Sequence, residues 1–289
     1  MSTQSQLQSA MVAAGIIPPE CIVFDGVLRR HGPGGKPFWY VAHGDGVPAA
    51  SFGSWKTGHT ETWCAKSKFD MSAAERQATW DRVRCAQQQR DAERSRIHAE
   101  AALHALAVWT SAAPAIEHPY LVRKSIKPHG IRTDGQHLLI PRRDTAGKLW
   151  SLQTINASGE KRFMPGGRVT GTYFSIGHPA GTVIVCEGVA TGATLNESTG
   201  CAIAVAFSAG NLMAVALALR AKYQDMELTI AADDDFLTVG NPGMTAARAA
   251  AAAVGAKLAI PNFDGLVRGI KDTDFNDVAR LLNEQGAAS

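Results

Sequence analysis

Acidic side chains stand directly after two apolar runs, and their types and spacing make them the residues of this sequence best suited to chemistry. The run at 182–186 is followed by Glu187, and the run at 227–232 is followed by Asp233, Asp234 and Asp235. Apolar runs of this kind are typical of buried parallel strands, and ligands of parallel sheets bind at the carboxyl ends of the strands. We therefore expect the carboxylates to meet at one edge of a sheet.

The chemistry expected of such a group is the binding of a divalent cation. Carboxylates gathered without lysine partners repel one another, and a hard cation, Mg²⁺ or Mn²⁺, takes oxygen ligands and can be shared with substrate phosphates. The segment Lys271-Asp272-Thr273-Asp274 repeats the D-x-D spacing of the aspartates after the second run. The predicted catalytic residues are Glu187, Asp233 and Asp235, and the predicted metal ligands are these three with Asp272 and Asp274.

Asp234 is the ambiguous member of its group. Alternate residues of an extended segment point the same way, so Asp234 should face away from its two acidic neighbours. It is either a spare ligand or, as we favour, an outward-facing residue without a role in the site.

The elements that must position these acids alternate between strands and helices. The pattern predicts strands at 182–186, 202–207, 227–232 and 256–260, with helices at 189–199, 211–223 and 242–254 between them. This order is typical of an α/β doubly wound parallel sheet. Neither GxGxxG nor GxxxxGK[ST] occurs in the segment, so the sequence indicates neither a dinucleotide site nor a P-loop.

A basic segment precedes the acidic one. Residues 118–176 hold ten Lys and Arg against three acids, around strands predicted at 138–141, 149–155 and 171–176. Cations at turns stay solvated and could face a nucleic-acid strand or a triphosphate, although any one of them could be an ordinary surface charge. The candidate nucleic-acid or nucleotide-binding residues are Arg123, Lys124, Arg142, Arg143, Lys148, Lys161, Arg162, Arg168 and, further along, Lys271.

Charge is divided unevenly along the chain. The net charge is +3, but residues 1–180 hold 22 basic and 14 acidic side chains, whereas residues 181–289 hold 7 and 12. A basic body beside an acidic metal-binding domain suits an enzyme that handles a polyphosphate substrate.

The first part of the chain is a module of short strands and glycine turns, for which we expect a small antiparallel sheet. Its aromatic residues are interleaved with cations, as in sheets that stack unpaired bases, but they could equally form the core of so small a sheet, which we favour. The candidate stacking residues are Trp39, Tyr40, Trp55 and Trp63. A long helix should follow, starting at a capping box of Ser72 and Glu75 and docking through Leu103, Leu106 and Trp109.

Composition excludes two classes of protein. Five cysteines without a C-x-x-C pair cannot form a zinc ribbon. No apolar run reaches membrane-spanning length and the first residues are not those of a signal peptide, so we expect a cytoplasmic protein without a membrane partner.

Several motifs in order resemble the Toprim family, in the form found in DnaG-like DNA primases of conjugative plasmids, integrative elements and phages. The matching segments are Glu187-Gly188-Val189-Ala190-Thr191-Gly192, Ala206-Phe207-Ser208-Ala209-Gly210-Asn211-Leu212, Asp233-x-Asp235, Asn241-Pro242-Gly243 and Lys271-Asp272-Thr273-Asp274-Phe275-Asn276-Asp277. The resemblance implies synthesis of short RNA primers on single-stranded DNA from nucleoside triphosphates, with Mg²⁺ or Mn²⁺ and a replicative helicase as partner. A Toprim nuclease and a non-catalytic single-stranded DNA-binding protein are the alternatives.

The same resemblance divides the chain into four expected parts. Residues 1–70 would form the small β-rich module, 71–112 the connecting helix, 113–180 a basic α+β primase subdomain and 181–289 the Toprim domain.

Overall fold

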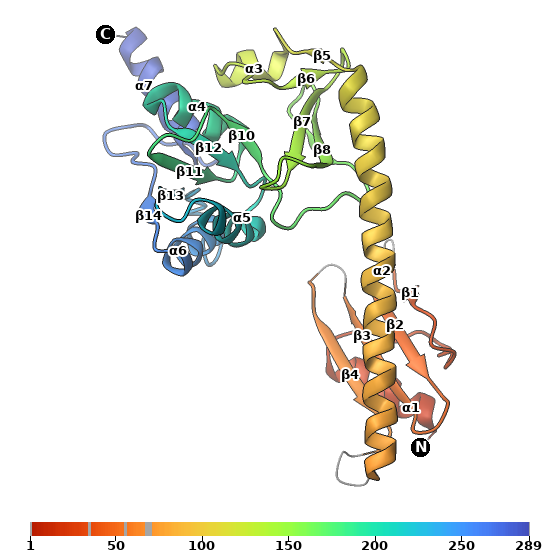
Figure 1. Cartoon of the computed structure of the whole chain (residues 1–289). Coiled ribbons are helices and arrows are strands. Elements are labelled where there is room, and N and C mark those ends of the chain that lie inside the picture. The colour runs from red at the N-terminus through yellow and green to blue at the C-terminus, as the bar shows by residue number, and fades with distance from the viewer. Residues whose placement is uncertain (1, 34–35, 55–56, 67–70, 289) are drawn as a thin grey trace. The chain divides into compact units, whose positions relative to one another are not determined.

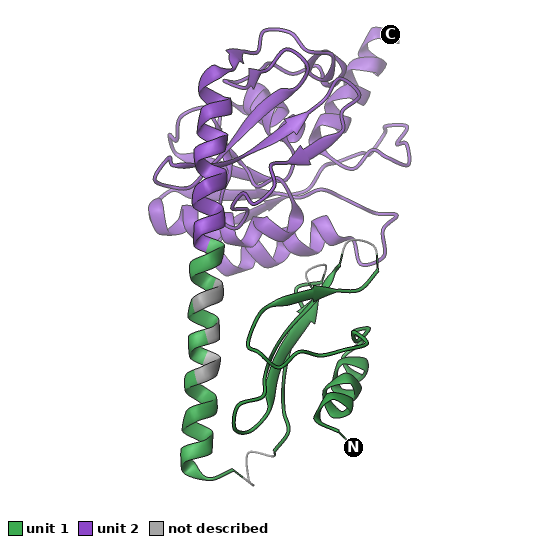
Figure 2. Ribbon diagram, turned by 90° about the vertical axis from the view of Figure 1, so that its right-hand side faces the viewer, with its two compact units in different colours: residues 1–94 green, residues 95–289 purple. Residues whose placement is uncertain are grey.

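The computed structural model describes residues 2–33, 36–54, 57–66 and 71–288. The chain forms two compact units, residues 1–94 and residues 95–289 (Figure 2), and each is described by itself. Within the described ranges, no helix combines the length and the apolar character needed to cross a membrane.

The first unit is built on a four-stranded antiparallel sheet. Helix α1 (Thr3–Ala13) is followed by β1 (Arg29–His31), β2 (Phe38–His43), β3 (Ala49–Ser54) and β4 (Thr60–Cys64), which pair in chain order. The expected antiparallel sheet is thus confirmed. Its core joins Leu7 and Met11 of the helix to Tyr40 and Phe52 of the strands.

The aromatic residues of this sheet are mostly core residues. Trp39 and Tyr40 are 5 % and 2 % exposed, and the Tyr40 hydroxyl accepts the N–H of Val23. The prediction that these two rings stack on bases is therefore wrong. A small sheet has few other apolar side chains with which to fill its interior. Trp63 is partly buried against the same core, and Trp55 lies outside the described residues.

Helix α2 (Ala73–Ser111) begins at the predicted capping box. The N–H of Ser72 donates to Glu75 at 2.8 Å and the N–H of Glu75 donates to the Ser72 hydroxyl at 3.2 Å. Leu103 and Leu106 are 69 % and 50 % exposed, so the prediction that they dock the helix was wrong. From residue 95 onward the helix belongs to the second unit. There Ala105 is buried against Leu149 and Leu152, with Val108 and Trp109 partly buried beside it. The small side chain of Ala105 lets the helix approach these residues closely.

The second unit contains the end of α2, from residue 95 onward, and its described residues form two sheets and five further helices (Figure 1). Its first sheet is antiparallel, in the order β5 (Ala113–Pro114), β6 (Arg132–Thr133), β7 (Leu138–Arg143), β8 (Leu149–Ile155) and β9 (Lys161–Phe163), with α3 (Pro119–Lys124) between β5 and β6. We call it the cationic sheet, since most of the predicted phosphate-binding cations lie on it or on its turns.

The second sheet has the strand order β10 (Phe174–Ile176), β12 (Ala202–Val205), β11 (Thr182–Cys186), β13 (Glu227–Ala231) and β14 (Lys257–Ala259). Strands β11 to β14 pair in parallel, as the sequence predicts, whereas β10 pairs with β12 antiparallel. The sheet is therefore mixed, and residues 174–176, which we assigned to the basic subdomain, complete its edge.

Helices cover both faces of the second sheet. Figure 1 shows α4 (Val189–Thr199) and α7 (Phe275–Ala288) on one face and α5 (Ala209–Lys222) and α6 (Pro242–Val254) on the other. The core under α4 also takes in Leu138, Ile140 and Ile155 of the cationic sheet. The two sheets thus share one hydrophobic core, which fixes the cations relative to the acids.

Candidate active site

The acids meet where the sequence predicts. Strands β11 and β13 are parallel neighbours with Val185 opposite Ile230, so Glu187 and Asp233 leave the sheet at the same edge. Asp274 reaches this edge from the start of α7, where its Oδ1 accepts the N–H groups of Asn276 and Asp277 at 2.7 and 3.0 Å. We call Glu187, Asp233, Asp235 and Asp274 the acidic edge.

Two oxygens of the acidic edge are buried without a hydrogen-bond partner, Oε1 of Glu187 and Oδ1 of Asp233. Burial, and then the charge of Asp235, raise the pKa of Glu187 to about 7, against the hydrogen bond from the Ala209 N–H. Burial raises the pKa of Asp233 to about 8, aided by the charges of its three acidic neighbours and opposed by Lys161. Negative charge here is costly unless a cation balances it.

The carboxylates of Asp235 and Asp274 accept hydrogen bonds that the buried oxygens of Glu187 and Asp233 lack. The Asp235 carboxylate accepts the N–H of Gly243 at 3.2 Å, in the first turn of α6. A Cβ at Gly243 would lie 2.8 Å from the Asp233 carbonyl oxygen, so a glycine is needed for this close approach. Burial, and then the charge of Asp277, raise the pKa of Asp274, although its Oδ2 accepts the Thr191 hydroxyl at 3.0 Å.

The acidic edge fits a divalent cation by the chemistry of its donors. Buried carboxylate oxygens without partners are the ligands that Mg²⁺ and Mn²⁺ prefer. Across the described ranges, however, no three Asp, Glu, His or Cys side chains are already grouped as a metal site. The acidic edge thus offers the carboxylate oxygens that such a cation binds, and a bound cation would relieve the repulsion between them.

Asp234 and Asp272 have a different environment, because an arginine holds each of them. The Asp234 carboxylate lies 2.8 Å from Arg268 Nη1 and accepts the Asn241 side chain at 2.7 Å. Burial acts to raise the pKa of Asp234, but these two bonds hold it below its usual value. Asp272 lies 2.6 Å from Arg280 and accepts the N–H of Gly269 at 2.8 Å.

These two acids therefore hold loops together. Asp234 faces away from the acidic edge, as predicted, but it is not idle, since it ties the loop after β13 to the segment around Arg268. The structure does not bring Asp272 into the electrostatic group of Glu187 and Asp233. Its pairing with Arg280 gives it a structural role in place of the metal-binding role that the sequence predicts.

Lys161 of β9 is a predicted cation whose charge acts on the acidic edge. Lys161 as a whole is exposed, yet the chain around its ammonium group excludes enough water to lower the pKa of that group. The negative charges of Asp274 and Asp233 act in the opposite direction and raise the pKa. Lys124 of α3 also acts on Asp274, and its Nζ lies 3.4 Å from Asp277. Positive charge from the cationic sheet and from α3 thus adjoins the acids.

Other predicted cations are held on tryptophan rings. Lys148 Nζ and the Arg168 guanidinium lie 3.8 and 4.9 Å from the ring centroid of Trp150. Arg143 lies 5.8 Å from the ring of Trp109, which Arg132 approaches to 4.7 Å. Such stacking orders a cation while leaving it charged. The sequence does not reveal that Arg143 contacts Trp109 or that Arg168 contacts Trp150, because each cation is far from its ring along the chain.

Arg142 does not lie on the surface, so its predicted contact with nucleic acid is wrong. The residue is 0 % exposed, because both faces of β7 are covered and the side chain of Arg142 packs under β9 and the turn after β12. Lys271, by contrast, is exposed.

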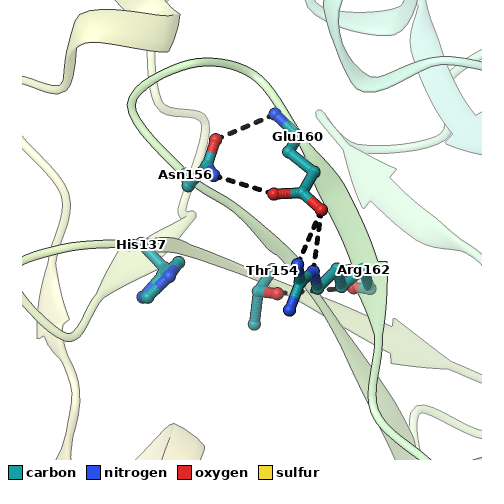
Figure 3. A pocket seen from close by; sticks show the side chains of 5 residues that line it. All are labelled: His137, Thr154, Asn156, Glu160 and Arg162. Carbon is teal, nitrogen blue, oxygen red and sulfur yellow. Dashed lines mark hydrogen bonds and ion pairs between the residues drawn. The ribbon is translucent and has the colours of Figure 1, made fainter.

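Arg162 and Arg123 are tied to the hairpin between β8 and β9. Arg162 pairs with Glu160 at 2.8 Å beside a hollow of about 270 Å³, and Figure 3 shows Glu160 bonded to Asn156 there as well. Arg123 donates to the Ala157 carbonyl at 3.0 Å. His137 and Thr154 complete the lining of this hollow, which contains none of the acidic edge.

Comparison with known proteins agrees with the geometry of the acidic edge. Residues 182–284 match the family model described as "Toprim domain". This part of the chain is a Toprim domain. Its span includes the whole acidic edge and both arginine-paired aspartates.

Relatives of the chain extend the likeness beyond the Toprim domain. Two proteins of Escherichia coli, both named "DNA primase TraC", are 38 % identical over 243 residues and 37 % identical over 248 residues. These matches cover 80 % and 78 % of this chain but only 23 % and 16 % of the relatives. The chain therefore spans about a fifth of their length.

The primase fragment of the bacteriophage T7 primase-helicase protein is a similar solved structure. It is 15 % identical, covers 61 % of this chain and 76 % of its own, and has a TM-score of 0.42. A likeness this low carries no argument about function.

Proposed function

We propose that this chain is the nucleotidyl-transfer part of a DNA primase, which makes short RNA primers on single-stranded DNA. The observation that carries the proposal is the acidic edge, where buried oxygens of Glu187 and Asp233 lack partners and a lysine of the cationic sheet lies close by. The identity to two proteins named DNA primase supports it.

In this proposal Glu187, Asp233, Asp235 and Asp274 hold Mg²⁺ or Mn²⁺. When bound, the cation supplies Lewis acidity toward the attacking 3′-hydroxyl and the phosphate oxygens. Catalysis of phosphoryl transfer is largely positioning and neutralisation of charge, so the acids need cations near the phosphates. Lys161 is placed for that role, since its charge acts on both Asp233 and Asp274.

The template would follow the cationic sheet. Lys148, Arg168, Arg143 and Arg132 are ordered by Trp150 and Trp109 and remain charged, as a surface that binds phosphates without reading sequence requires. A replicative helicase is the further partner we propose, and the cytoplasm is the proposed location.

The test is incubation with a single-stranded template, Mg²⁺ and labelled nucleoside triphosphates. We expect oligonucleotides from the wild type, none from Asp233→Asn, and undiminished synthesis from Asp264→Asn, which alters an exposed aspartate of the same domain. Template degradation would identify a nuclease instead, and binding without turnover would identify a non-catalytic DNA-binding protein.

A further inference from the structure

Arg142 is a buried cation that the proposed reaction does not use. Its Nε donates to the Thr172 hydroxyl at 3.2 Å and its Nη2 donates to the Val169 carbonyl at 3.1 Å, but Nη1 is buried without a partner. Within the described part of the chain, no carboxylate forms an ion pair with it. An unpaired buried donor is destabilising, so the protein holds this arginine at a cost in stability.

The guanidinium stacks on two phenylalanines. It lies 4.7 Å from the ring centroid of Phe163 on β9 and 4.6 Å from that of Phe207, and the two rings are 6.2 Å apart with an angle of 82°. Stacking and bonding together use both the faces and the edges of the group, which neither lysine nor an apolar side chain can do.

Phe207 has a backbone conformation that needs such support. Its φ is 71°, in the left-handed region that is unfavourable for a residue with a Cβ. Phe207 lies in the turn between β12 and α5. Asn211 also stabilises this turn, since its side chain donates to the Ala206 and Thr172 carbonyls at 2.9 Å each.

The same turn holds Glu187 of the acidic edge. The N–H of Phe207 donates to the Glu187 carbonyl at 2.9 Å, and the N–H of Ala209 hydrogen-bonds the Glu187 carboxylate, which opposes the burial that raises its pKa. A continuous path of contacts therefore runs from the Arg142 guanidinium through the Phe207 ring and backbone to Glu187.

We propose that Arg142 is a positioning residue, which keeps Phe207 in its left-handed conformation and thereby fixes Glu187 for a divalent cation. The inference rests on the proposed metal site at the acidic edge. It replaces the nucleic-acid contact predicted from the sequence with a role inside the protein.

The test measures free Mn²⁺ by electron paramagnetic resonance during titration of the full chain. We expect Arg142→Met to weaken Mn²⁺ binding about tenfold, at the lower end of the cost of removing support from a metal ligand. Arg142→Lys should recover part of the loss, because the charge still meets the rings. Arg248→Met, which alters an exposed arginine on α6, should bind as the wild type does. Affinity for a single-stranded oligonucleotide should stay within about twofold for Arg142→Met, since a buried residue cannot reach the strand.

Two further variants separate the possible failures. Phe207→Leu keeps an apolar side chain but removes the ring, and it should weaken Mn²⁺ binding even if Arg142→Met does not fold. Glu187→Gln should abolish binding at the site, and unchanged Mn²⁺ binding by it would overturn the proposed metal site itself. If Glu187→Gln loses Mn²⁺ while folded Arg142→Met and Phe207→Leu retain wild-type affinity, the role of Arg142 is refuted and the metal site stands.

Discussion

Acids that look alike in the sequence have opposite environments in the two regions where they gather. At the acidic edge, Glu187 and Asp233 have buried oxygens without partners and raised pKa values. In the loops behind it, Asp234 and Asp272 are each held by an arginine, and their pKa values are lowered.

This difference teaches how a cluster of carboxylates can be divided by role. An acid that an arginine satisfies contributes to stability, whereas an acid left unpaired costs stability and is available to a ligand. The first, second and third aspartates of Asp233-Asp234-Asp235 alternate between these roles because successive side chains of an extended segment face opposite ways.

The largest effect should come from Asp233→Asn. Primer synthesis should fall by roughly 100-fold or more, since a metal at the reacting phosphate supplies several kcal/mol. At pH 8 and above the variant should nevertheless be more stable by about 1 kcal/mol, because the amide removes the buried negative charge that Asp233, with its pKa of about 8, carries there. Radiolabelled primer assays check the loss of synthesis, and thermal melting checks the gain in stability. A variant less stable than the wild type would contradict the account of an uncompensated charge.

Asp234→Ala should act mainly on stability. It removes bonds from Arg268 and Asn241 and leaves the mostly buried Arg268 guanidinium with hydrogen bonds to backbone carbonyls but without its carboxylate partner, so we expect a loss of about 2 kcal/mol. Melting temperature should fall by about 4–8 °C in a domain of this size. Chemical denaturation checks the free energy of unfolding, and a variant as stable as the wild type would remove the distinction drawn between the two regions.

The pH dependence of stability provides a third test. In metal-free protein the raised pKa values of Glu187 and Asp233, about 7 and 8, mean that the folded state holds protons which the unfolded state has lost. Stability from these groups is therefore present at about pH 4–5 and is lost as pH rises through 7 to 8. Melting in a chelator from pH 5 to pH 9 should show this decline, and Asp233→Asn should flatten it. An equal decline in both proteins would assign the effect elsewhere.

Arg280→Met should have the smallest effect. It frees Asp272 from its ion pair, but the arginine is half-exposed and such pairs contribute about 1 kcal/mol or less. We expect the melting temperature to fall by about 2–4 °C, and primer synthesis to stay within about twofold of the wild type. A collapse of synthesis would show that the loop at Asp272 belongs to the active site after all.

The sequence predicted the scaffold of the acidic edge well. Strand β11 and helices α4 and α6 have the expected bounds, because their apolar runs, the glycine at 200 and the proline at 242 mark where each element begins or ends. The convergence of Glu187 and Asp233 followed from the parallel strands alone.

What the sequence could not predict depends on partners far away in the chain. Nothing near Asp272 distinguishes it from Asp274, and only the folded chain brings Arg280 to one and the buried edge to the other. Arg142 and Arg143 are neighbours on β7, yet one is buried and the other stacks on Trp109, because strand alternation decides the side and tertiary packing decides what covers it.

The most direct test of the central claim is the melting temperature of the protein as Mg²⁺ is added at pH 8. If the unpaired carboxylates bind the cation, the wild type should gain about 2.7 kcal/mol at 100 times the dissociation constant, a rise of about 5–10 °C. Asp234→Ala should gain as much from its lower starting point, and Asp233→Asn should gain little. A wild type that does not respond to Mg²⁺, or an Asp233→Asn variant that responds equally, would contradict the account.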